Sequence, residues 1–448
     1  MTASSATASE TPVKSQRIGF VHLGCPKNLV DTETMLGVLD KAGHQIVADE
    51  SEADIVLVNT CAFIEKAQEE SVRVLAGLAE GGKRLMITGC LAQKFQQELL
   101  DLFPEADAVI GINNVPEVAD VLARVERGER VLAVQQDPTY ILEEDVVRRH
   151  VTVGAYTYLK IAEGCDYQCS FCIIPSMRGA FRSRSIANLV ENAKALVDRG
   201  VSELVLVGQD TTSYGKDIDS SLPQLLQALN DIDGLSWIRF MYAYPNLVSD
   251  ELLETIDGCD KVVKYLDCPL QHSHPEVLRR MRRPMTDLPE FVERVRSKIR
   301  NVKLRTSFIV GFPGETEAHY QHLKQTIETL RWDRLGVFEY SDVDTAHSKT
   351  LDGKVQKSVI KSRRNELMAL QQQISFELNQ SLVGQVLPVL VETIHAFGSI
   401  EGRTQWDAPE VDNSVIIKGS DAAQVLPGEI VLVEITSATP YDLKGRII

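Results

Sequence analysis

Three closely spaced cysteines, Cys165, Cys169 and Cys172, lie in the middle of the chain and form the pattern Cys-x3-Cys-x2-Cys. They follow an apolar run at 156–161 that predicts a β-strand, and a short loop after a strand can turn three thiolates toward one point. Three thiolates with no fourth nearby leave one iron of a 4Fe–4S cube open to an exogenous ligand. Ferredoxin spacings supply four cysteines, and zinc sites usually pair their cysteines and close the fourth position. The spacing therefore favours an open iron–sulfur cluster, with a structural zinc site as the alternative.

The order strand, cysteine, helix occurs three times in the N-terminal third of the chain. Apolar runs at 18–23, 54–58 and 84–87 are followed by Cys25, Cys61 and Cys90, and helical patterns come next, the first two at about 31–42 and 62–79. Strands that alternate with helices predict a parallel, doubly wound sheet, whose strand ends share the edge at which ligands bind. We therefore expect the three cysteines to converge and to hold a second cluster with three protein ligands. Three buried structural cysteines are the alternative, and no Gly-x-Gly-x-x-Gly follows these strands to support a dinucleotide site.

Six apolar, strand-like runs alternate with helical patterns in the central part of the chain. They lie at 156–161, 203–207, 237–242, 262–266, 304–310 and 334–340. Six such units predict an open (β/α) barrel, three quarters of a complete eight-unit barrel, with its active site at the carboxyl ends of the strands. The cluster loop falls at that position.

Polar residues and glycines follow several of these strands. Gln209 follows the second strand in what is also an ordinary turn sequence. Gln271 follows the fourth strand and can hydrogen-bond a ribose or a carboxylate. Gly311 follows the fifth, where a glycine lets the backbone approach a ligand closely. His272 and His274 have the side chains of a metal pair, although a hydrogen-bonded or solvated role is the simpler interpretation.

The hydrophobic period changes in the last part of the chain. A Gln-rich helical pattern at about 365–378 leads out of the barrel, and short strands with a period of two follow it. The strands are expected at 385–392, 399–403, 414–417, 429–436 and 443–448. Short strands with Gly and Pro turns predict a small antiparallel β-barrel of the OB-like type. The expected domains are then an N-terminal α/β domain at 17–127, a linker at 128–150, a barrel at 151–380 and a C-terminal barrel at 381–448.

The composition is ordinary for a soluble globular protein, with 448 residues of which 44% are hydrophobic and 25% charged. No apolar run approaches the ~20 residues that span a membrane, and residues 1–16 lack the apolar core of a signal peptide and predict a disordered tail. We therefore expect a cytoplasmic protein, in which eight cysteines argue for metal or redox use over disulfides. Cys259 and Cys268 lack partners at ligand spacing and are expected to be structural. The net charge of −16 and the pI near 5.1 suit a basic partner better than nucleic acid. A local basic stretch at 279–283 suits recognition of a carboxylate or phosphate, or else is a solvated helix face.

The central cysteine loop, with Phe171 immediately before its last cysteine, resembles the cluster loop of the radical S-adenosylmethionine superfamily. The resemblance implies that the amino and carboxylate groups of S-adenosylmethionine bind the open iron. It also implies an external electron donor and a reduced cluster that cleaves the C5′–S bond, which leaves a 5′-deoxyadenosyl radical. Gly311 lies in a segment that looks like the adenine-binding turn of the superfamily. The expected contacts of S-adenosylmethionine are then Phe171, Gln209, Gln271 and Gly311.

A three-cysteine α/β domain followed by such a barrel resembles the methylthiotransferase family. The segments 24–31 (Gly-Cys-Pro-Lys-Asn-Leu-Val-Asp) and 173–179 (Ile-Ile-Pro-Ser-Met-Arg-Gly) resemble the branch that modifies a ribosomal protein, whereas the branch that modifies tRNA typically has Gln-Met-Asn after its first Gly-Cys. The resemblance implies two 4Fe–4S clusters, a TRAM domain at 381–448, and a transferase that methylthiolates the β-carbon of an aspartate in the small-subunit ribosomal protein numbered twelve. Cys25, Cys61 and Cys90 would hold the cluster whose open iron carries the sulfur or methylthio group. One S-adenosylmethionine would donate the methyl group and another would be cleaved.

The charge of the tail favours the same branch. Residues 381–448 carry nine acids and four bases, whereas a phosphate-binding face needs an excess of Lys and Arg. We therefore do not expect the tail to bind RNA, and the acidic segment 407–412 is a candidate contact for the basic ribosomal protein, whether free or in the ribosome. The alternative functions are a tRNA-adenosine methylthiotransferase and an iron–sulfur carrier without catalysis.

Overall fold

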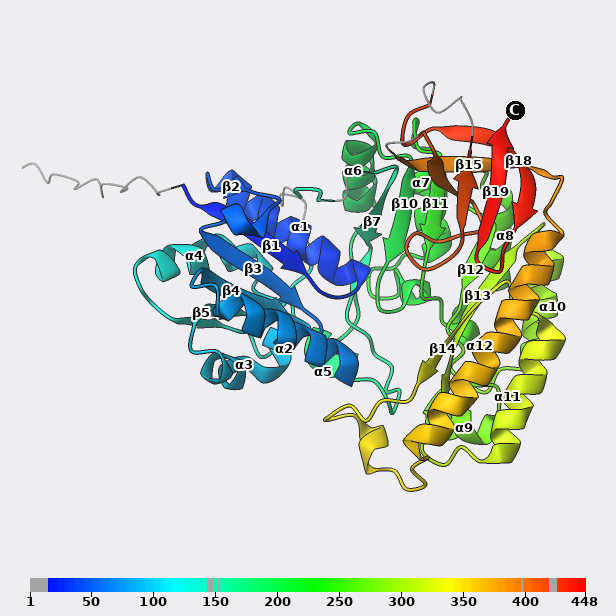
Figure 1. Ribbon diagram of the computed structural model, residues 1–448, viewed down its shortest axis with the longest axis horizontal. Coiled ribbons are helices and arrows are strands. Elements are labelled where there is room, and N and C mark those ends of the chain that lie inside the picture. Colours follow the sequence, from blue (N-terminus) through cyan, green and yellow to red (C-terminus); the bar gives the residue numbers. More distant parts are fainter. Residues whose placement is uncertain (1–14, 143–147, 152–153, 396–397, 419–424) are drawn as a thin grey trace, which may run out of the picture. The chain divides into compact units, whose positions relative to one another are not determined.

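The computed structural model describes residues 15–142, 148–151, 154–395, 398–418 and 425–448 (Figure 1). The chain divides into an N-terminal unit (1–62, 66–140 and 145–151) and a C-terminal unit (63–65, 141–144 and 152–448). Residues 1–14 of the expected disordered tail lie outside the described residues. Among the helices of the described residues, none combines the length and apolar character needed to cross a membrane.

The N-terminal unit is built on a six-stranded sheet in the order β2-β1-β3-β4-β5-β6. Its strands are β1 (Arg17–His22), β2 (Gln45–Ile46), β3 (Ile55–Thr60), β4 (Arg84–Gly89), β5 (Ala106–Ile110) and β6 (Val131–Ala133). Its helices are α1 (Pro26–Lys41), α2 (Glu65–Ala79), α3 (Cys90–Leu102) and α4 (Val118–Glu126), with short 3-10 turns η1 (Glu50–Glu52) and η2 (Val115–Glu117). All neighbouring strands pair in parallel, so the expected parallel α/β sheet is confirmed.

The sequence pattern predicted β1, β3 and β4 within one or two residues and missed the other three strands. β2 has two residues, which is too short for any period to be visible. β6 lies inside the stretch expected to be a linker and pairs with β5. The central strand β3 is buried along its whole length, because helices cover both faces of a parallel sheet.

The C-terminal unit begins with an open barrel of parallel strands. They are β7 (Tyr156–Lys160), β10 (Glu203–Val207), β11 (Trp237–Phe240), β12 (Tyr265–Asp267), β13 (Lys303–Val310) and β14 (Arg334–Glu339). Two three-stranded sheets, β11-β10-β7 and β12-β13-β14, are joined by a parallel bridge between Ile238 and Val262. The six expected barrel strands are therefore confirmed. Outside this barrel, β8 (Ala162–Glu163) and β9 (Arg182–Ser183) form a small antiparallel pair.

The barrel helices begin where a side chain can cap them. The helices that connect successive strands are α6 (Ile186–Val197), α7 (Leu222–Asn230), α8 (Asp250–Gly258), α10 (Leu288–Lys298) and α11 (Glu317–Leu330), and the shorter α5 (Ile174–Arg178) and α9 (Pro275–Arg280) follow β8 and β12. Each of the five connecting helices has a Ser, Asp or Thr at its N-cap whose side chain accepts a backbone N–H of the first turn, which satisfies a donor that the helix itself leaves unpaired. Apolar side chains of these helices and of the strands form one continuous core.

A closed five-stranded barrel completes the C-terminal unit. Its strands are β15 (Val386–Ile394), β16 (Ile400–Thr404), β17 (Ser414–Ile417), β18 (Ile430–Ala438) and β19 (Asp442–Ile447). The order is β15-β16-β17-β19-β18, and all pairs are antiparallel except β17 with β19. The expected small β-barrel is confirmed with this one parallel pair. The helix that leads to it, α12 (Lys357–Gln380), is longer than the sequence pattern indicated and packs beside α11 and β14 (Figure 1).

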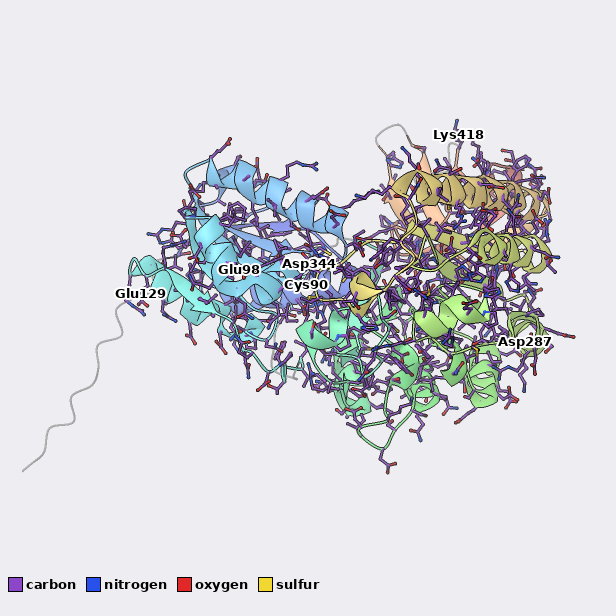
Figure 2. The ribbon with its side chains drawn as sticks, turned by 90° about the horizontal axis from the view of Figure 1, so that it is seen from below. Cys90, Glu98, Glu129, Asp287, Asp344 and Lys418 are labelled. Carbon is purple, nitrogen blue, oxygen red and sulfur yellow. The ribbon has the colours of Figure 1, made fainter. Side chains whose placement is uncertain are left out.

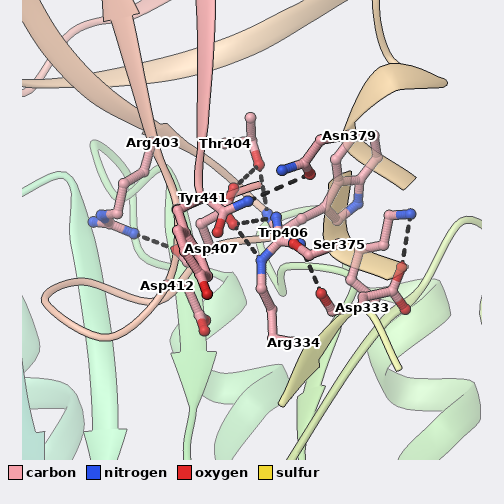
Figure 3. Close-up of polar contacts among 12 residues, drawn as sticks. Asp333, Arg334, Ser375, Asn379, Arg403, Thr404, Trp406, Asp407, Asp412 and Tyr441 are labelled. Atoms are coloured by element: carbon pink, nitrogen blue, oxygen red, sulfur yellow. Dashed lines mark hydrogen bonds and ion pairs between the residues drawn. The ribbon is translucent and has the colours of Figure 1, made fainter. Parts of the chain in front are cut away.

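Two buried ion pairs and a hydrogen bond connect the closed barrel to the amino ends of the open-barrel strands. Arg334, the first residue of β14, donates from Nε to Asp407 Oδ1 at 2.8 Å (Figure 3). Glu203, the first residue of β10, accepts from Arg403 at 2.6 Å. Tyr265, the first residue of β12, donates to Asp412 at 2.6 Å. The closed barrel therefore lies at the amino ends of the strands, opposite the rim that carries the cluster loop.

These contacts correct the expectation that the acidic segment 407–412 binds a basic protein. Asp407 is 1% exposed and paired with Arg334, and the Asp412 side chain is 3% exposed and lies 3.3 Å from Arg305. Only Glu410 and Val411 of the segment are exposed. The sequence shows the acids but not the arginines that neutralise them, because those arginines come from strands about 75 to 110 residues earlier in the chain.

We expect Arg334→Met to destabilise the C-terminal unit by about 3–5 kcal/mol, because it leaves the Asp407 carboxylate buried without its cation. Urea unfolding followed by tryptophan fluorescence measures the loss. The matched control is Arg446→Met, which breaks an exposed pair with Glu434 and should cost less than about 1 kcal/mol. Equal losses in the two variants would contradict the role assigned to the buried pair.

Candidate functional sites

The loop that carries Cys165, Cys169 and Cys172 follows β8 at the carboxyl end of the first barrel strand. The three sulfur atoms lie close enough together for charges on Cys165 and Cys169 to act on Cys172. Burial raises the pKa of the Cys165 thiol to about 11 and that of the Cys172 thiol to about 12. Both thiols are therefore protonated at neutral pH in the metal-free protein, and binding of a metal must release their protons.

Backbone geometry fixes the start of this loop. Gly164 has φ +80°, and a Cβ at this position would lie 2.0 Å from the carbonyl oxygen of Ala180. The next residue, Cys165, donates its N–H to the Gly179 carbonyl at 3.1 Å. Only glycine combines this φ with such a close approach of two chain segments, so the direction of Cys165 depends on Gly164.

Phe171 and its neighbour anchor the far side of the loop. Ser170 donates its N–H to the Met281 carbonyl at 3.0 Å, and the Phe171 ring packs against a small apolar cluster that contains Met281 and Phe312. Phe312 follows Gly311 in the turn after β13. The expected contact residue Phe171 therefore lies beside that turn.

A buried charged network lies directly before the loop. Glu163 accepts from Lys160 Nζ at 2.7 Å, from Arg178 at 2.7 Å and from Gln209 Nε2 at 2.9 Å. Burial opposes ionisation of this carboxyl, but the charges of Arg178 and Lys160 outweigh it and hold the pKa of Glu163 well below its usual range. Gln209 Oε1 is buried and accepts no hydrogen bond from the described residues. It is thus an open acceptor beside the cluster loop.

The other expected contact residues lie at neighbouring strand ends. Gln271 has φ +72°, and its backbone pairs with the end of β13 through bonds to Ser307 (2.8 Å) and Ile309 (2.7 Å). Gly311 has φ +77° and donates its N–H to Glu315 at 2.8 Å. These residues share the carboxyl rim of the open barrel with the cluster loop.

Three histidine rings near Gln271 accept backbone N–H groups, two of them at the starts of helices. His274 Nδ1 accepts the N–H of Glu276 (3.2 Å) at the start of α9, and His319 Nδ1 accepts the N–H of Thr316 (3.3 Å) at the start of α11. His272 is fully buried and accepts the N–H of His274 at 2.9 Å. Because each Nδ1 accepts a hydrogen bond, the neutral rings carry their proton on Nε2, where a metal would need a lone pair. His274, Glu276 and His319 are close enough together to hold a metal, but these hydrogen bonds oppose it.

One amide, that of Asn28, contacts two of the three N-terminal cysteines and the residue before the third. Cys25 precedes α1, Cys61 follows β3, and Cys90, labelled in Figure 2, is the first residue of α3. The thiols of Cys25 and Cys90 both lie near Asn28 Oδ1, at 3.8 and 3.6 Å. Asn28 Nδ2 donates to the carbonyl of Thr60, the residue before Cys61, at 3.1 Å. The strand order therefore brings the three cysteines to one edge of the sheet.

Both sets fit an iron–sulfur cluster with an open iron. All six cysteines are free thiols, and each set offers three soft ligands from one edge of a parallel sheet. Cys268 packs in the apolar core and does not extend the central set. Two polar residues at these sites, Glu163 and Asn28, were not among the predicted site residues. Their position in the sequence could have indicated both residues, because Glu163 lies two residues before Cys165 and Asn28 lies three residues after Cys25.

We expect Gly164→Ala to reduce the iron that the central cysteines bind, because the added Cβ cannot coexist with the Ala180 carbonyl. The metal-free protein should also lose about 1–3 kcal/mol of unfolding free energy. Anaerobic reconstitution with iron counting, together with urea unfolding, tests both effects. Gly258→Ala is the control, because a Cβ there meets no atom within 4 Å. Full iron binding in Gly164→Ala would show that the loop can move away from the added Cβ without loss of the site, which would contradict the role assigned to Gly164.

Three families match successive parts of the chain. Residues 17–111 match "Uncharacterized protein family UPF0004", residues 159–327 match the radical SAM superfamily, and residues 383–448 match the TRAM domain. A radical S-adenosylmethionine methyltransferase, TsrM from Kitasatospora setae, has a similar fold, with a TM-score of 0.54 and 15% identity over 72% of this chain and 73% of that one.

Whole-length relatives are much more similar in sequence. The chain is 46% identical over 454 residues to "Ribosomal protein uS12 methylthiotransferase RimO" of Synechococcus sp. (strain CC9902), which covers 100% of this chain and 97% of the relative. It is 48% identical over 437 residues to the protein of the same name in Prochlorococcus marinus (strain MIT 9303), over 96% of this chain and 92% of the relative.

Proposed function

The chain belongs to the RimO family of ribosomal protein uS12 methylthiotransferases, and from this membership we propose that it replaces a hydrogen on the β-carbon of an aspartate in uS12 by a methylthio group. It is a radical S-adenosylmethionine enzyme. The observation that carries the proposal is the presence of two three-cysteine sites, each at the carboxyl edge of a parallel sheet.

Cys165, Cys169 and Cys172 hold the 4Fe–4S cluster that membership of the radical SAM superfamily implies. When bound, this group supplies one-electron cleavage of S-adenosylmethionine to methionine and a 5′-deoxyadenosyl radical, with the electron taken from an external donor. The Gly164 turn sets the direction of the first ligand.

Gln209 binds the methionine end of S-adenosylmethionine. Its buried Oε1 lacks a donor among the described residues, and an ammonium group is the donor that such a position favours. Its Nε2 is held by Glu163, which fixes the direction of the amide. Gln271 and Gly311 contact the ribose and the adenine from the neighbouring strand ends, and Phe171 supports the loop beneath them.

Cys25, Cys61 and Cys90 would hold a second 4Fe–4S cluster, which would supply the sulfur or the methylthio group from its open iron. The contacts of Asn28 with the Cys25 and Cys90 thiols, and with the carbonyl of the residue before Cys61, support this assignment. With this cluster bound, one S-adenosylmethionine would give its methyl group to the sulfur and leave as S-adenosylhomocysteine. A second, cleaved at the central site, would take a hydrogen atom from the aspartate β-carbon and leave as 5′-deoxyadenosine and methionine. Transfer of the methylthio group to that carbon would form the C–S bond, break the bond of the group to iron, and leave one electron on the cluster.

The partner is uS12, either free or in the ribosome, and the C-terminal barrel is not proposed to bind RNA. Of its four bases, Arg403 is 2% exposed and Arg446 is paired with Glu434. Lys418 and Lys444 do not make the basic face that phosphate binding requires. The pairing of Asp407 and Asp412 inside the protein also removes them as contacts for uS12, so charge in this barrel no longer argues for either branch of the family.

We expect the wild-type protein to bind about eight irons after anaerobic reconstitution and the Cys25/Cys61/Cys90→Ala variant about four, because each site holds one four-iron cluster. Mössbauer and EPR spectroscopy identify the clusters. Mass spectrometry of uS12 incubated with each protein measures methylthiolation, which should be lost in the triple variant and in Cys165→Ala.

The control is Cys259→Ala, which removes a cysteine outside both sets and should leave about eight irons. About four irons in both the wild type and the triple variant would make the N-terminal cysteines structural. Modified tRNA with unmodified uS12 would assign the protein to the tRNA-adenosine branch. Two clusters without any turnover of S-adenosylmethionine would make it a carrier.

A further inference from the structure

Arg283 contacts a cysteine of the central cluster loop. Its NH1 donates to Cys169 Sγ at 3.9 Å, and its NH2 donates to the Pro269 carbonyl at 2.7 Å. Because both nitrogens belong to one planar guanidinium, the carbonyl fixes the direction in which NH1 points. Arg280, in the same basic stretch, instead pairs with Asp352, and Arg282 is exposed.

Two stacked tyrosine rings hold the guanidinium in place. The Arg283 Cζ lies 4.1 Å from the centroid of the Tyr244 ring. The Tyr167 ring stacks on the Tyr244 ring, with the two ring centroids 3.8 Å apart and the two planes parallel within 1°. Tyr167 is part of the cluster loop, and Tyr244 is 8% exposed. The stack therefore ties Arg283 to the loop and limits the access of water to one face of its charge.

The charge of Arg283 has no carboxylate partner among the described residues, and its Nε is buried there without a hydrogen bond. A half-buried cation is costly unless an anion lies nearby. The anions at hand are the thiolates that form when the loop binds a cluster. Reduction adds a further negative charge to that cluster, so a fixed cation stabilises the reduced form more than the oxidised form.

We propose that Arg283 is a positioning residue that orients the Cys169 ligand and raises the reduction potential of the cluster held by Cys165, Cys169 and Cys172. The inference rests on the proposed assignment of these three cysteines as ligands. The step concerned is the uptake of one electron from a reductant, with no bond formed or broken in the protein. Hydrogen bonds and charges next to the ligand sulfurs are known levers on such potentials.

The test is an EPR-monitored redox titration with dithionite on the full chain, in the Cys25/Cys61/Cys90→Ala background so that one cluster gives the signal. We expect Arg283→Gln to lower the ratio of reduced to oxidised cluster about tenfold at a given solution potential. This corresponds to a fall of about 59 mV in the reduction potential of a one-electron couple. Arg283→Lys keeps the charge but cannot donate to the sulfur and the carbonyl at the same time. The reduction potential of its cluster should therefore lie between that of the parent and that of Arg283→Gln. Arg282→Gln removes an exposed charge one residue away and should leave the potential unchanged.

An unchanged potential in Arg283→Gln, with iron content equal to that of the parent, would overturn the inference. If the parent itself binds no cluster, the proposed function fails instead. If Arg283→Gln binds no iron, the variant Tyr244→Leu replaces it in the test, because it keeps Arg283 but admits water to the guanidinium. A lowered reduction potential in Tyr244→Leu supports the inference, and an unchanged potential refutes it.

Discussion

Parallel pairing of strands is the constraint on which both cysteine sites depend. In a parallel sheet every strand presents its carboxyl end at the same edge, so loops that are far apart in the chain meet there. The ladder between β3 and β4, in which Thr60 pairs with Gly89, fixes how far Cys61 and Cys90 extend beyond that edge. A slip of one residue would reverse the faces of a strand and separate the thiols, so the arrangement of the three cysteines is a property of the whole sheet.

The two ends of the open barrel are specialised by the charges buried there. At the carboxyl rim, Glu163 is paired with two cations, and Arg283 remains available to an anionic group. At the amino ends, the buried pair of Arg334 with Asp407 holds the closed barrel in place. Buried ion pairs contribute little net stability compared with apolar packing, but they accept only one arrangement of partners. They therefore fix which end of the barrel is covered.

Much of the fold and of both cysteine sets could be predicted from the sequence, because apolar period and cysteine spacing are local signals. The strands β3 and β13 are long and apolar, and their predicted bounds were close to those observed. Side-chain direction is not local. No local pattern indicates that Asp407 faces Arg334, or that Arg283 alone of its basic stretch faces Cys169, because both contacts depend on segments that only the tertiary fold brings near.

The single parallel pair in the closed barrel has a consequence for biosynthesis. β19 lies between β17 and β18, yet it is translated after both of them. Until it emerges from the ribosome, β17 and β18 each expose an unpaired edge, which is the kind of surface that recruits strands of other chains. Hairpins between consecutive strands do not form the pair of β17 with β19, so closure of this barrel is a late event that chaperones have the most reason to protect.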